Sequence, residues 1–315
     1  MANTPTTDPA AEPLEGDGTI RPGRLVLVGT PIGNLGDLTP RAVEVLGSAD
    51  LVCCEDTRRT GRLLQHAGVR AKALKVVNDH TEGDVVPHVL QRLGGGETVA
   101  VVTDAGMPGI SDPGERLVAA AVAAGFVVEV VPGPSAAVTA LVASGLPAGR
   151  FVFEGFLPRK GSGRTERLTE VCAERRTVVL YEAPHRLART VADLLDGCGP
   201  DRGVVLSREL TKLHEEHWRG SLAGAVAHVA EVEPRGEYVV VLDGAPAPAA
   251  DTDGAIVAAL DAARAGGASN RDAVASVSAE LHVAKRRVYA LATGSVSGVV
   301  GASDPAGDPG PPGPA

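Results

Sequence analysis

The sequence predicts an α/β protein with two α/β domains and a small helical domain near its C-terminal end. Three observations lead to this prediction. Short β-branched runs alternate with amphipathic segments in two successive series, and an alanine- and proline-rich segment, residues 245–250, separates both series from a last, purely helical stretch. The length of 315 residues suits two domains and a smaller part.

The first α/β domain is expected over residues 23–148. It follows residues 1–22, which are rich in Pro, Thr, Asp and Glu and are expected to be disordered. Its apolar runs are hydrophobic on both faces, which is typical of a parallel sheet covered by helices on both sides. The expected strands are Leu25–Val28, Leu51–Cys54, Ala73–Val77, Thr98–Val102 and Val127–Val131.

The second α/β domain is expected over residues 149–245 and the helical domain over residues 252–293, with a disordered tail at residues 294–315. The expected strands of the second domain are Phe151–Leu157, Thr177–Tyr181, Gly203–Leu206 and Tyr238–Leu242, and its expected helices are Thr165–Glu174, His185–Leu195 and Leu222–Glu231. The expected helices of the last domain are Ala255–Ala265, Arg271–Leu281 and Lys285–Leu291.

Charge and cysteine content restrict the function classes. The net charge of −9 disfavours non-specific coating of nucleic acid, because such binding depends on neutralising phosphates. The four cysteines form no CxxC pair, which fits a reducing compartment. The longest nearly uncharged stretch, from Leu117 to Val128, is too short to cross a bilayer. With no secretory signal in the acidic N-terminal segment, we expect a cytoplasmic protein.

Three loops indicate a small-molecule site. Residues 29–37, 104–114 and 132–136 follow the first, fourth and fifth expected strands and are rich in Gly and Pro. The carboxyl ends of parallel strands meet at one edge of a sheet, where ligands bind, and glycine lets backbone approach a ligand closely. We therefore expect these loops to form a cradle for a small molecule.

Several common site chemistries are missing from the sequence. No GxGxxG follows a strand, and no P-loop motif occurs. The segment Gly133-Pro-Ser-Ala-Ala137 begins like a nucleophile elbow but lacks the final glycine. His214 and His217 do not have the i, i+4 spacing of a two-histidine zinc helix, so no metal site is expected.

As a set, the loops resemble the ribosomal RNA small subunit methyltransferase I family of the tetrapyrrole methylase superfamily. Superfamily members that act on porphyrin-like rings generally have a GxG-type first loop and GDP after the fourth strand. Here those positions are Gly29-Thr-Pro-Ile-Gly33 and Asp104-Ala-Gly106, which favours the ribosomal branch. The matching motifs, over about residues 24–244, are Gly29–Asp37, Glu55–Arg58, Asp104–Gly114, Pro132–Ala136, Phe153–Lys160, Tyr181–Arg186, Arg208–Lys212 and Gly236–Tyr238.

The resemblance implies two α/β domains of the tetrapyrrole methylase type with S-adenosylmethionine (AdoMet) in the cleft between them, usually in a homodimer. It also implies 2′-O-methylation of a cytidine in the decoding region of 16S rRNA, with the 30S subunit as partner. The residues that it implies for AdoMet binding are Pro31, Asp104, Ala105, Gly106, Ser135, Ala136, Tyr181, Glu182 and Ala183.

A ribose hydroxyl is a poor nucleophile until a base accepts its proton. Four side chains in the matched motifs could act as that base, and the sequence does not choose between them. These candidates are Glu55, Asp56, Glu182 and His185.

Contacts to RNA phosphates are expected from basic side chains in the same motifs. For Arg58 and Arg186 the alternative role is an ion pair, with Asp56 and Glu182 as the respective partners. The expected RNA-binding residues are Arg58, Arg186, Lys160 and Lys212.

Two other functions remain open from the sequence. One is a methylase of a tetrapyrrole or another small molecule that uses the same cleft. The other is a non-catalytic RNA-binding protein with a degenerate cleft, to which the basic segment Lys285-Arg-Arg287 gives some support.

Overall fold

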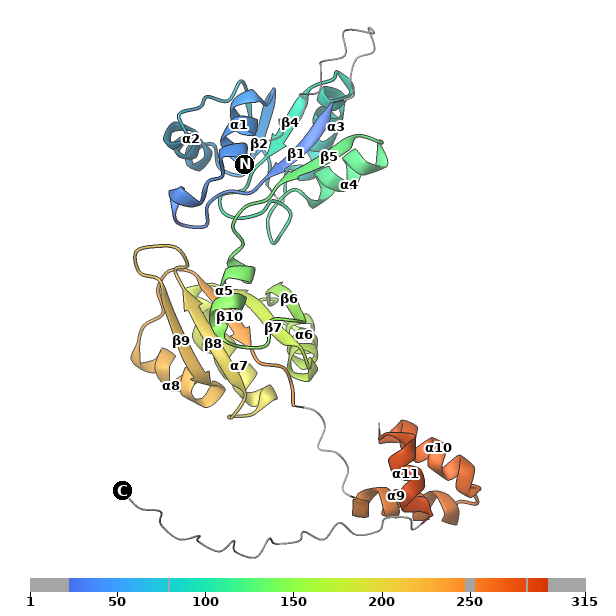
Figure 1. Cartoon of the computed structure of the whole chain (residues 1–315). Helices are drawn as coiled ribbons and strands as arrows, with labels where there is room; N and C mark the ends of the chain where they lie inside the picture. The colour runs from blue at the N-terminus through green and yellow to red at the C-terminus, as the bar shows by residue number, and fades with distance from the viewer. Residues whose placement is uncertain (1–22, 79, 247–252, 282, 294–315) are drawn as a thin grey trace, which may run out of the picture. The chain divides into compact units, whose positions relative to one another are not determined.

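The computed structural model describes residues 23–78, 80–246, 253–281 and 283–293 of the chain. The chain divides into two compact units, Met1–Ala245 and Pro246–Ala315. In the described part, the first unit holds two β-sheets and the second unit three helices (Figure 1). The tails expected at residues 1–22 and 294–315 lie outside the described residues. Among the described helices, none has the length and apolar character needed to span a bilayer.

The first sheet has five strands in the order β3-β2-β4-β1-β5, and all its pairings are parallel. This arrangement confirms the predicted parallel sheet. The edge strands β3 and β5 are largely exposed, whereas the inner strands are almost fully buried. The strands are β1 (Arg24–Val28), β2 (Leu51–Cys54), β3 (Leu74–Val76), β4 (Thr98–Val101) and β5 (Val127–Val131).

Helices cover both faces of this sheet. Successive residues of β1 point to opposite sides, so neighbouring residues pack against different helices. Val26 and Val28 pack with α1 and α2, whereas Leu25 packs with α3 and α4 (Figure 1). Thr39 caps α1 by accepting a hydrogen bond from the backbone N–H of Ala42 at 3.2 Å. The helices are α1 (Pro40–Ser48), α2 (Thr57–His66), α3 (Glu82–Gly94) and α4 (Glu115–Ala123), with a short 3-10 helix, η1 (Leu35–Asp37), before α1.

The second sheet is mixed, with the order β6-β7-β10-β8-β9. Strands β6 and β7 are parallel, whereas β10 runs antiparallel to both of its neighbours. The first residues of β10 therefore lie beside the last residues of β7, as in the pair Tyr238 and Glu182. The strands are β6 (Phe151–Phe156), β7 (Thr177–Glu182), β8 (Gly203–Arg208), β9 (Glu216–Ser221) and β10 (Tyr238–Leu242).

Helices also cover the second sheet. Helix α5 follows β5 in the chain but packs against the second sheet, where Ala140 and Leu141 contact Val179 and Val241 in one buried cluster. The opposite face of the sheet packs against the other three helices of this part. The helices are α5 (Ala136–Ser144), α6 (Ser162–Ala173), α7 (Pro184–Cys198) and α8 (Leu222–Glu231).

Strand β9 was not predicted from the sequence. Its residues, Glu-His-Trp-Arg-Gly-Ser, are mostly polar and exposed or half-buried, since β9 is an edge strand that pairs only with β8. An edge strand needs no continuous apolar run, so the hydrophobic pattern gave no signal.

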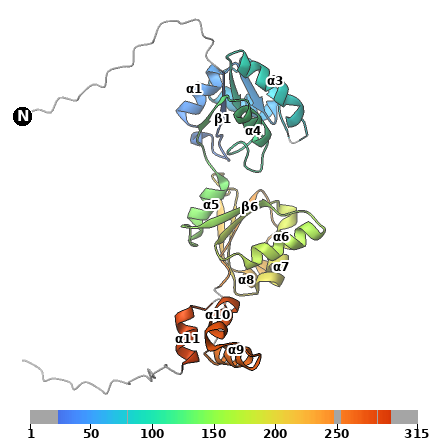
Figure 2. The same ribbon diagram turned by 90° about the vertical axis from the view of Figure 1, so that its right-hand side faces the viewer.

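The second unit is a small three-helix bundle (Figure 2). Its core contains Ile256, Leu260, Val274 and Val288, all at most 2% exposed. Ser269 caps the middle helix by accepting a hydrogen bond from the backbone N–H of Asp272 at 3.2 Å. The helices are α9 (Asp253–Ala265), α10 (Asn270–Glu280) and α11 (Lys285–Ala292).

Candidate active site

A cavity of about 400 Å³ lies within the first unit, between loops of both sheets. The first sheet contributes the loops that follow β1, β2, β4 and β5. The second sheet contributes the ends of β6 and β7 and, because β10 is antiparallel to β7, the start of β10. The volume is in the range of small-molecule sites. The cavity therefore lies at the sheet edge where the sequence predicted a cradle.

Two loops of this cradle touch each other through glycines. A Cβ atom added to Gly29 would lie 2.6 Å from the Cα atom of Gly133, and one added to Gly133 would lie 2.8 Å from the Cα atom of Gly29. Only backbone fits between them, so these positions require glycine. The loop after β1 is also hydrogen-bonded to the loop after β4. The N–H of Thr30 donates to the carbonyl of Gly106 at 2.9 Å, and the N–H of Gly106 donates to the carbonyl of Thr30 at 3.1 Å.

Most of the residues expected to bind AdoMet line this cavity. Pro31 is the exception: it is buried and does not contribute to the cavity wall, although it follows the paired residue Thr30. The expected residues in the wall are Asp104, Ala105, Gly106, Ser135, Ala136, Tyr181, Glu182 and Ala183.

The Asp104 carboxylate is held by the loop after β2. One oxygen accepts a hydrogen bond from the backbone N–H of Asp56 at 3.2 Å, and the other lies 3.4 Å from Nε of Arg59. The side chain of Asp104 is 21% exposed, so it still reaches the cavity. These contacts fix a negative charge in the cavity wall.

Asp56 serves as the N-cap of α2. Its carboxylate accepts a hydrogen bond from the backbone N–H of Arg58 at 2.7 Å and pairs with the Arg58 guanidinium at 3.2 Å. The hydrogen bond from the Arg58 side chain lowers the pKa of Asp56 below its ordinary value. Asp56 does not line the cavity, and the ion pair that the sequence offered as an alternative role for Arg58 is present.

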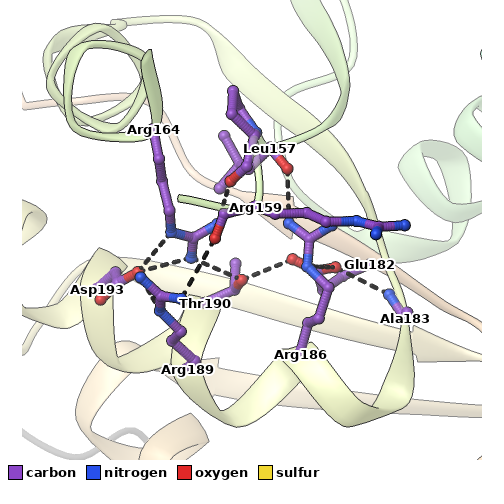
Figure 3. Close-up of polar contacts among 10 residues, drawn as sticks. Leu157, Arg159, Arg164, Glu182, Ala183, Arg186, Arg189, Thr190 and Asp193 are labelled. Atoms are coloured by element: carbon purple, nitrogen blue, oxygen red, sulfur yellow. Dashed lines mark hydrogen bonds and ion pairs between the residues drawn. The ribbon is translucent and has the colours of Figure 1, made fainter. Parts of the chain in front are cut away.

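Glu182 is 2% exposed, and both of its carboxylate oxygens have partners (Figure 3). Oε1 accepts a hydrogen bond from the backbone N–H of Ala183 at 2.9 Å and pairs with Nε of Arg186 at 3.1 Å. Oε2 accepts a hydrogen bond from the Thr190 hydroxyl at 2.6 Å. These contacts favour a positioning role for Glu182 at the start of α7, because the carboxylate is already committed.

The other predicted polar residues lie outside the cavity wall. His185 lines a separate pocket together with Arg186, and Lys160 is exposed. Lys212 donates from Nζ to Glu209 at 2.8 Å and to Glu237 at 2.6 Å. The geometry thus leaves Glu55 and Glu182 as the two candidate bases that reach the cavity.

Aromatic side chains form part of the cavity wall, namely those of Phe156, Tyr181 and Tyr238. Phe153 and Phe156 contact the Tyr181 ring edge-on, with centroid distances of 4.9 and 5.6 Å. The Tyr181 hydroxyl accepts a hydrogen bond from the backbone N–H of Ala137 at 3.2 Å. Burial raises the pKa of Tyr181 above its ordinary value.

The sequence analysis missed several residues of the cavity wall. All of them except Arg59 and Val239 fall inside the quoted motifs, and these two directly follow a motif, so the motifs could have identified them. That Leu210 and the start of β10 share one wall depends on the antiparallel pairing of the second sheet. The additional residues are Ile32, Arg59, Met107, Ile110, Ser111, Asp112, Phe156, Pro184, Leu210, Glu237, Tyr238 and Val239. Across the described ranges, no group of three His, Cys, Asp or Glu residues is arranged to hold a metal ion.

Comparisons with known proteins relate this site to a family. The family model described as "Tetrapyrrole (Corrin/Porphyrin) Methylases" matches residues 24–226. A protein of Synechocystis sp. is 49% identical over 223 residues, covering 71% of this chain and 80% of that protein. One of Mycobacterium bovis is 46% identical over 259 residues, covering 82% and 90%. Both are named "Ribosomal RNA small subunit methyltransferase I".

Solved structures share the fold. The methyltransferase CobJ gives a TM-score of 0.55 at 22% identity, covering 71% of this chain and 95% of that one. The cobalt precorrin-4 methyltransferase CbiF gives a TM-score of 0.54 at 19% identity, covering 75% and 100%. The resemblance stated from the motifs is confirmed by the relatives. The chain belongs to the tetrapyrrole methylase family and, within it, to the ribosomal RNA small subunit methyltransferase I group.

Proposed function

We propose that this protein transfers a methyl group from AdoMet to the ribose 2′-hydroxyl of a cytidine in the decoding region of 16S rRNA. The observation that carries the proposal is the cavity itself: eight of the nine residues that the family motifs imply for AdoMet binding line one space of about 400 Å³. The relatives named rRNA methyltransferases, at 46% to 49% identity over most of the chain, support the rRNA substrate.

The residues of the cavity fit AdoMet. The cavity wall combines fixed carboxylates, of which Asp104 is one, with apolar side chains such as those of Ile32 and Tyr181. Carboxylates suit the positive charges of the donor, and aromatic and aliphatic groups suit a nucleoside base. Gly106, at φ 81°, has only ordinary van der Waals neighbours around its Cβ position, so the backbone can approach a ligand there.

Positioning is the main contribution of the chain to catalysis. When bound, AdoMet supplies an activated methyl group and needs no metal. The paired loops at Gly29, Gly106 and Gly133 hold their backbone in fixed positions, so the cavity is already shaped before a ligand binds. Correct placement of two reactants can contribute about 7–11 kcal/mol to lowering a barrier.

Glu55 is the residue best placed to accept the proton of the ribose hydroxyl. It follows β2, is half-buried and lines the cavity. Of the other candidates, Asp56 and His185 do not line the cavity, and Glu182 is only 2% exposed, so a ribose hydroxyl reaches its carboxylate less easily than that of the half-buried Glu55. General-base action by Glu55 completes the proposed reaction, since it removes the proton as the new bond to carbon forms.

The alternative functions have less support. A tetrapyrrole methylase is disfavoured because the curated relatives at 46% to 49% identity are named as rRNA enzymes. A non-catalytic binding protein is disfavoured by the cavity, whose loops retain the glycines that a ligand cradle requires.

The first prediction concerns the reaction. The full chain, incubated with labelled AdoMet and 30S subunits that lack this modification, should place one methyl group on a cytidine ribose in the decoding region. Mass mapping of nuclease fragments of 16S rRNA measures the position, and calorimetry measures AdoMet binding. A porphyrinogen-type ring serves as the competing substrate. If the label appeared on the ring and not on the rRNA, the proposal would be refuted. AdoMet binding without any methyl transfer would refute it as well.

We also infer that the enzyme acts in the cytoplasm, on the 30S subunit, as a homodimer. Two exposed valines one turn apart on α5, Val138 and Val142, support a subunit contact, because apolar side chains on one helix face favour burial against a partner. Val142 is 69% exposed.

The second prediction tests the homodimer. Val142→Asp would bury a carboxylate in the proposed contact and should raise the dimer dissociation constant about a hundredfold. Sedimentation velocity over a concentration series measures the shift. Val122→Asp, at an exposed position on α4, is the matched control and should leave the dimer intact. A monomeric wild type, or equal behaviour of the two variants, would contradict the inference.

A further inference from the structure

A second pocket, of about 320 Å³, lies beside the turn between β7 and α7. Pro184 lines the AdoMet cavity, whereas the next residue, His185, lines this pocket, so consecutive residues of one turn border the two spaces. We propose that the pocket binds a backbone phosphate of the rRNA next to the nucleotide that is methylated; this inference rests on the proposed function. The pocket is lined by Arg159, Arg164, His185, Arg186, Arg189 and Thr190.

Arg164 forms a rigid base for the pocket. The residue is 3% exposed, and its guanidinium donates to Asp193 at 2.6 Å, to the Thr190 hydroxyl at 3.0 Å and to the carbonyl of Pro158 at 3.0 Å. Figure 3 shows Arg164 reaching from α6 toward the side chains of α7. A buried arginine with this many partners is fixed in place, which gives the pocket a preformed positive wall.

The Arg186 guanidinium is likewise held by contacts within the protein. Its guanidinium pairs with Glu182 at 3.1 Å and donates to the carbonyl of Leu157 at 2.6 Å. The side chain is only 18% exposed, so it reaches solvent little. The ion pair with Glu182 is the alternative role that the sequence offered for Arg186, and it is present. A contact of Arg186 with RNA stays a prediction.

Arg159 and Arg189 are the donors that face solvent. Arg159 is exposed and, among the residues that the structure describes, its side chain makes no ion pair. Arg189 is 62% exposed and lies 3.7 Å from Asp193, which Arg164 already holds more closely. Nη1 of Arg189 donates to the carbonyl of Arg159 at 3.3 Å, so the two residues are neighbours (Figure 3).

The charge balance of the pocket favours an anion. Four guanidiniums line it, whereas the two carboxylates in contact with them are Glu182 and Asp193, which leaves two positive charges uncompensated. The planar guanidinium group binds phosphate oxygens through two parallel hydrogen bonds. The first turn of α7 adds partial positive charge at the same place.

The position of the pocket favours the RNA backbone, rather than a free anion, as its ligand. For a ribose to enter the AdoMet cavity, the adjoining phosphates must lie at its rim, and this pocket begins one residue from the cavity wall. Phosphate contacts fix the register of a nucleic acid on a protein. Arg159 and Arg189 would therefore set which nucleotide reaches the methyl donor.

The third prediction uses charge removal in the full chain. Arg159→Ala and Arg189→Ala should each raise the KM for 30S subunits about tenfold at low salt. Each should also reduce the salt dependence of 30S binding, because one phosphate contact is lost. The slope of the logarithm of the binding constant against the logarithm of the salt concentration should fall in magnitude by about one. The kcat and the dissociation constant for AdoMet should stay at wild-type values. Arg159→Lys should restore part of the affinity.

Arg175→Ala is the matched control. Arg175 is exposed and lies two residues before the start of β7, at the opposite end of that strand from the pocket. Its replacement by alanine changes the net charge by the same amount. Equal KM values and salt slopes for the control and for both variants, with an active wild type, would overturn this inference alone. A wild type that does not methylate rRNA would instead overturn the proposed function. A loss of AdoMet affinity in the variants would show that the pocket belongs to the donor site.

Discussion

Glu55→Gln should lower kcat for rRNA methylation by about a hundredfold to ten-thousandfold, with AdoMet affinity close to that of the wild type. The substitution keeps the size and polarity of the side chain but removes its ability to accept a proton, which is the usual contribution of a general base. Glu55 directly follows β2 and lines the cavity. Single-turnover methylation at saturating AdoMet and 30S subunits measures the chemical step.

Glu182→Gln distinguishes catalysis from positioning. Glu182 holds Ala183, Arg186 and Thr190, so its replacement should mainly reduce the free energy of unfolding, by about 3 kcal/mol, because a partly buried guanidinium loses its partner. The folded fraction should keep a rate within a few-fold of the wild type. Denaturant unfolding and the single-turnover rate together separate the two effects. A normal rate in Glu55→Gln with a collapsed rate in folded Glu182→Gln would exchange the two roles.

The location of the site could be predicted because it follows from chain order. The loops after the strands of a parallel sheet meet at one edge, and the motif residues Asp104–Gly106 and Ser135 accordingly lie in the cavity wall. The strands themselves were visible as apolar runs, and β2, β5 and β10 have the predicted bounds. Such features depend on local sequence and on one rule of sheet topology.

Features that depend on contacts between distant segments could not be predicted. The sequence offered four candidate bases without a choice, and only the meeting of the loops after β2 and β7 shows that Glu55 and Glu182 line one cavity whereas Asp56 and His185 do not. The basic pocket has the same origin: it combines the loop after β6 with α7, which the parallel pairing of β6 and β7 brings together.

His214 and His217 lie in a polar segment that the sequence did not predict as a strand. Their spacing excluded a two-histidine zinc helix, but nothing in the hydrophobic pattern indicated β9. In the structure, His217 lies on β9, where its ring bonds the Ser207 hydroxyl at 2.9 Å and Glu215 at 3.0 Å. These partners on β8 and in the preceding turn anchor a polar edge strand, which no apolar pattern marks.

Gly133→Ala should weaken AdoMet binding by about a hundredfold or more and lower the free energy of unfolding by about 1–3 kcal/mol. Its new Cβ atom would lie 2.8 Å from both the Cα and the carbonyl carbon of Gly29, and backbone atoms cannot rotate away as a side chain can. The loops after β1 and β5 must therefore separate, which moves Ser135 in the cavity wall. A displacement of about 1 Å in a binding site can cost two orders of magnitude.

Gly61→Ala is the control that isolates this steric effect. Gly61 lies inside α2, and an added Cβ meets nothing within 4 Å. Alanine should therefore stabilise the helix by about 0.5–1 kcal/mol without changing AdoMet affinity. Calorimetry with AdoMet and denaturant unfolding compare both variants with the wild type. If Gly133→Ala bound AdoMet as tightly as Gly61→Ala, the contact between the two glycine loops would not shape the donor site, and the remaining contact between Thr30 and Gly106 would have to hold the cavity alone.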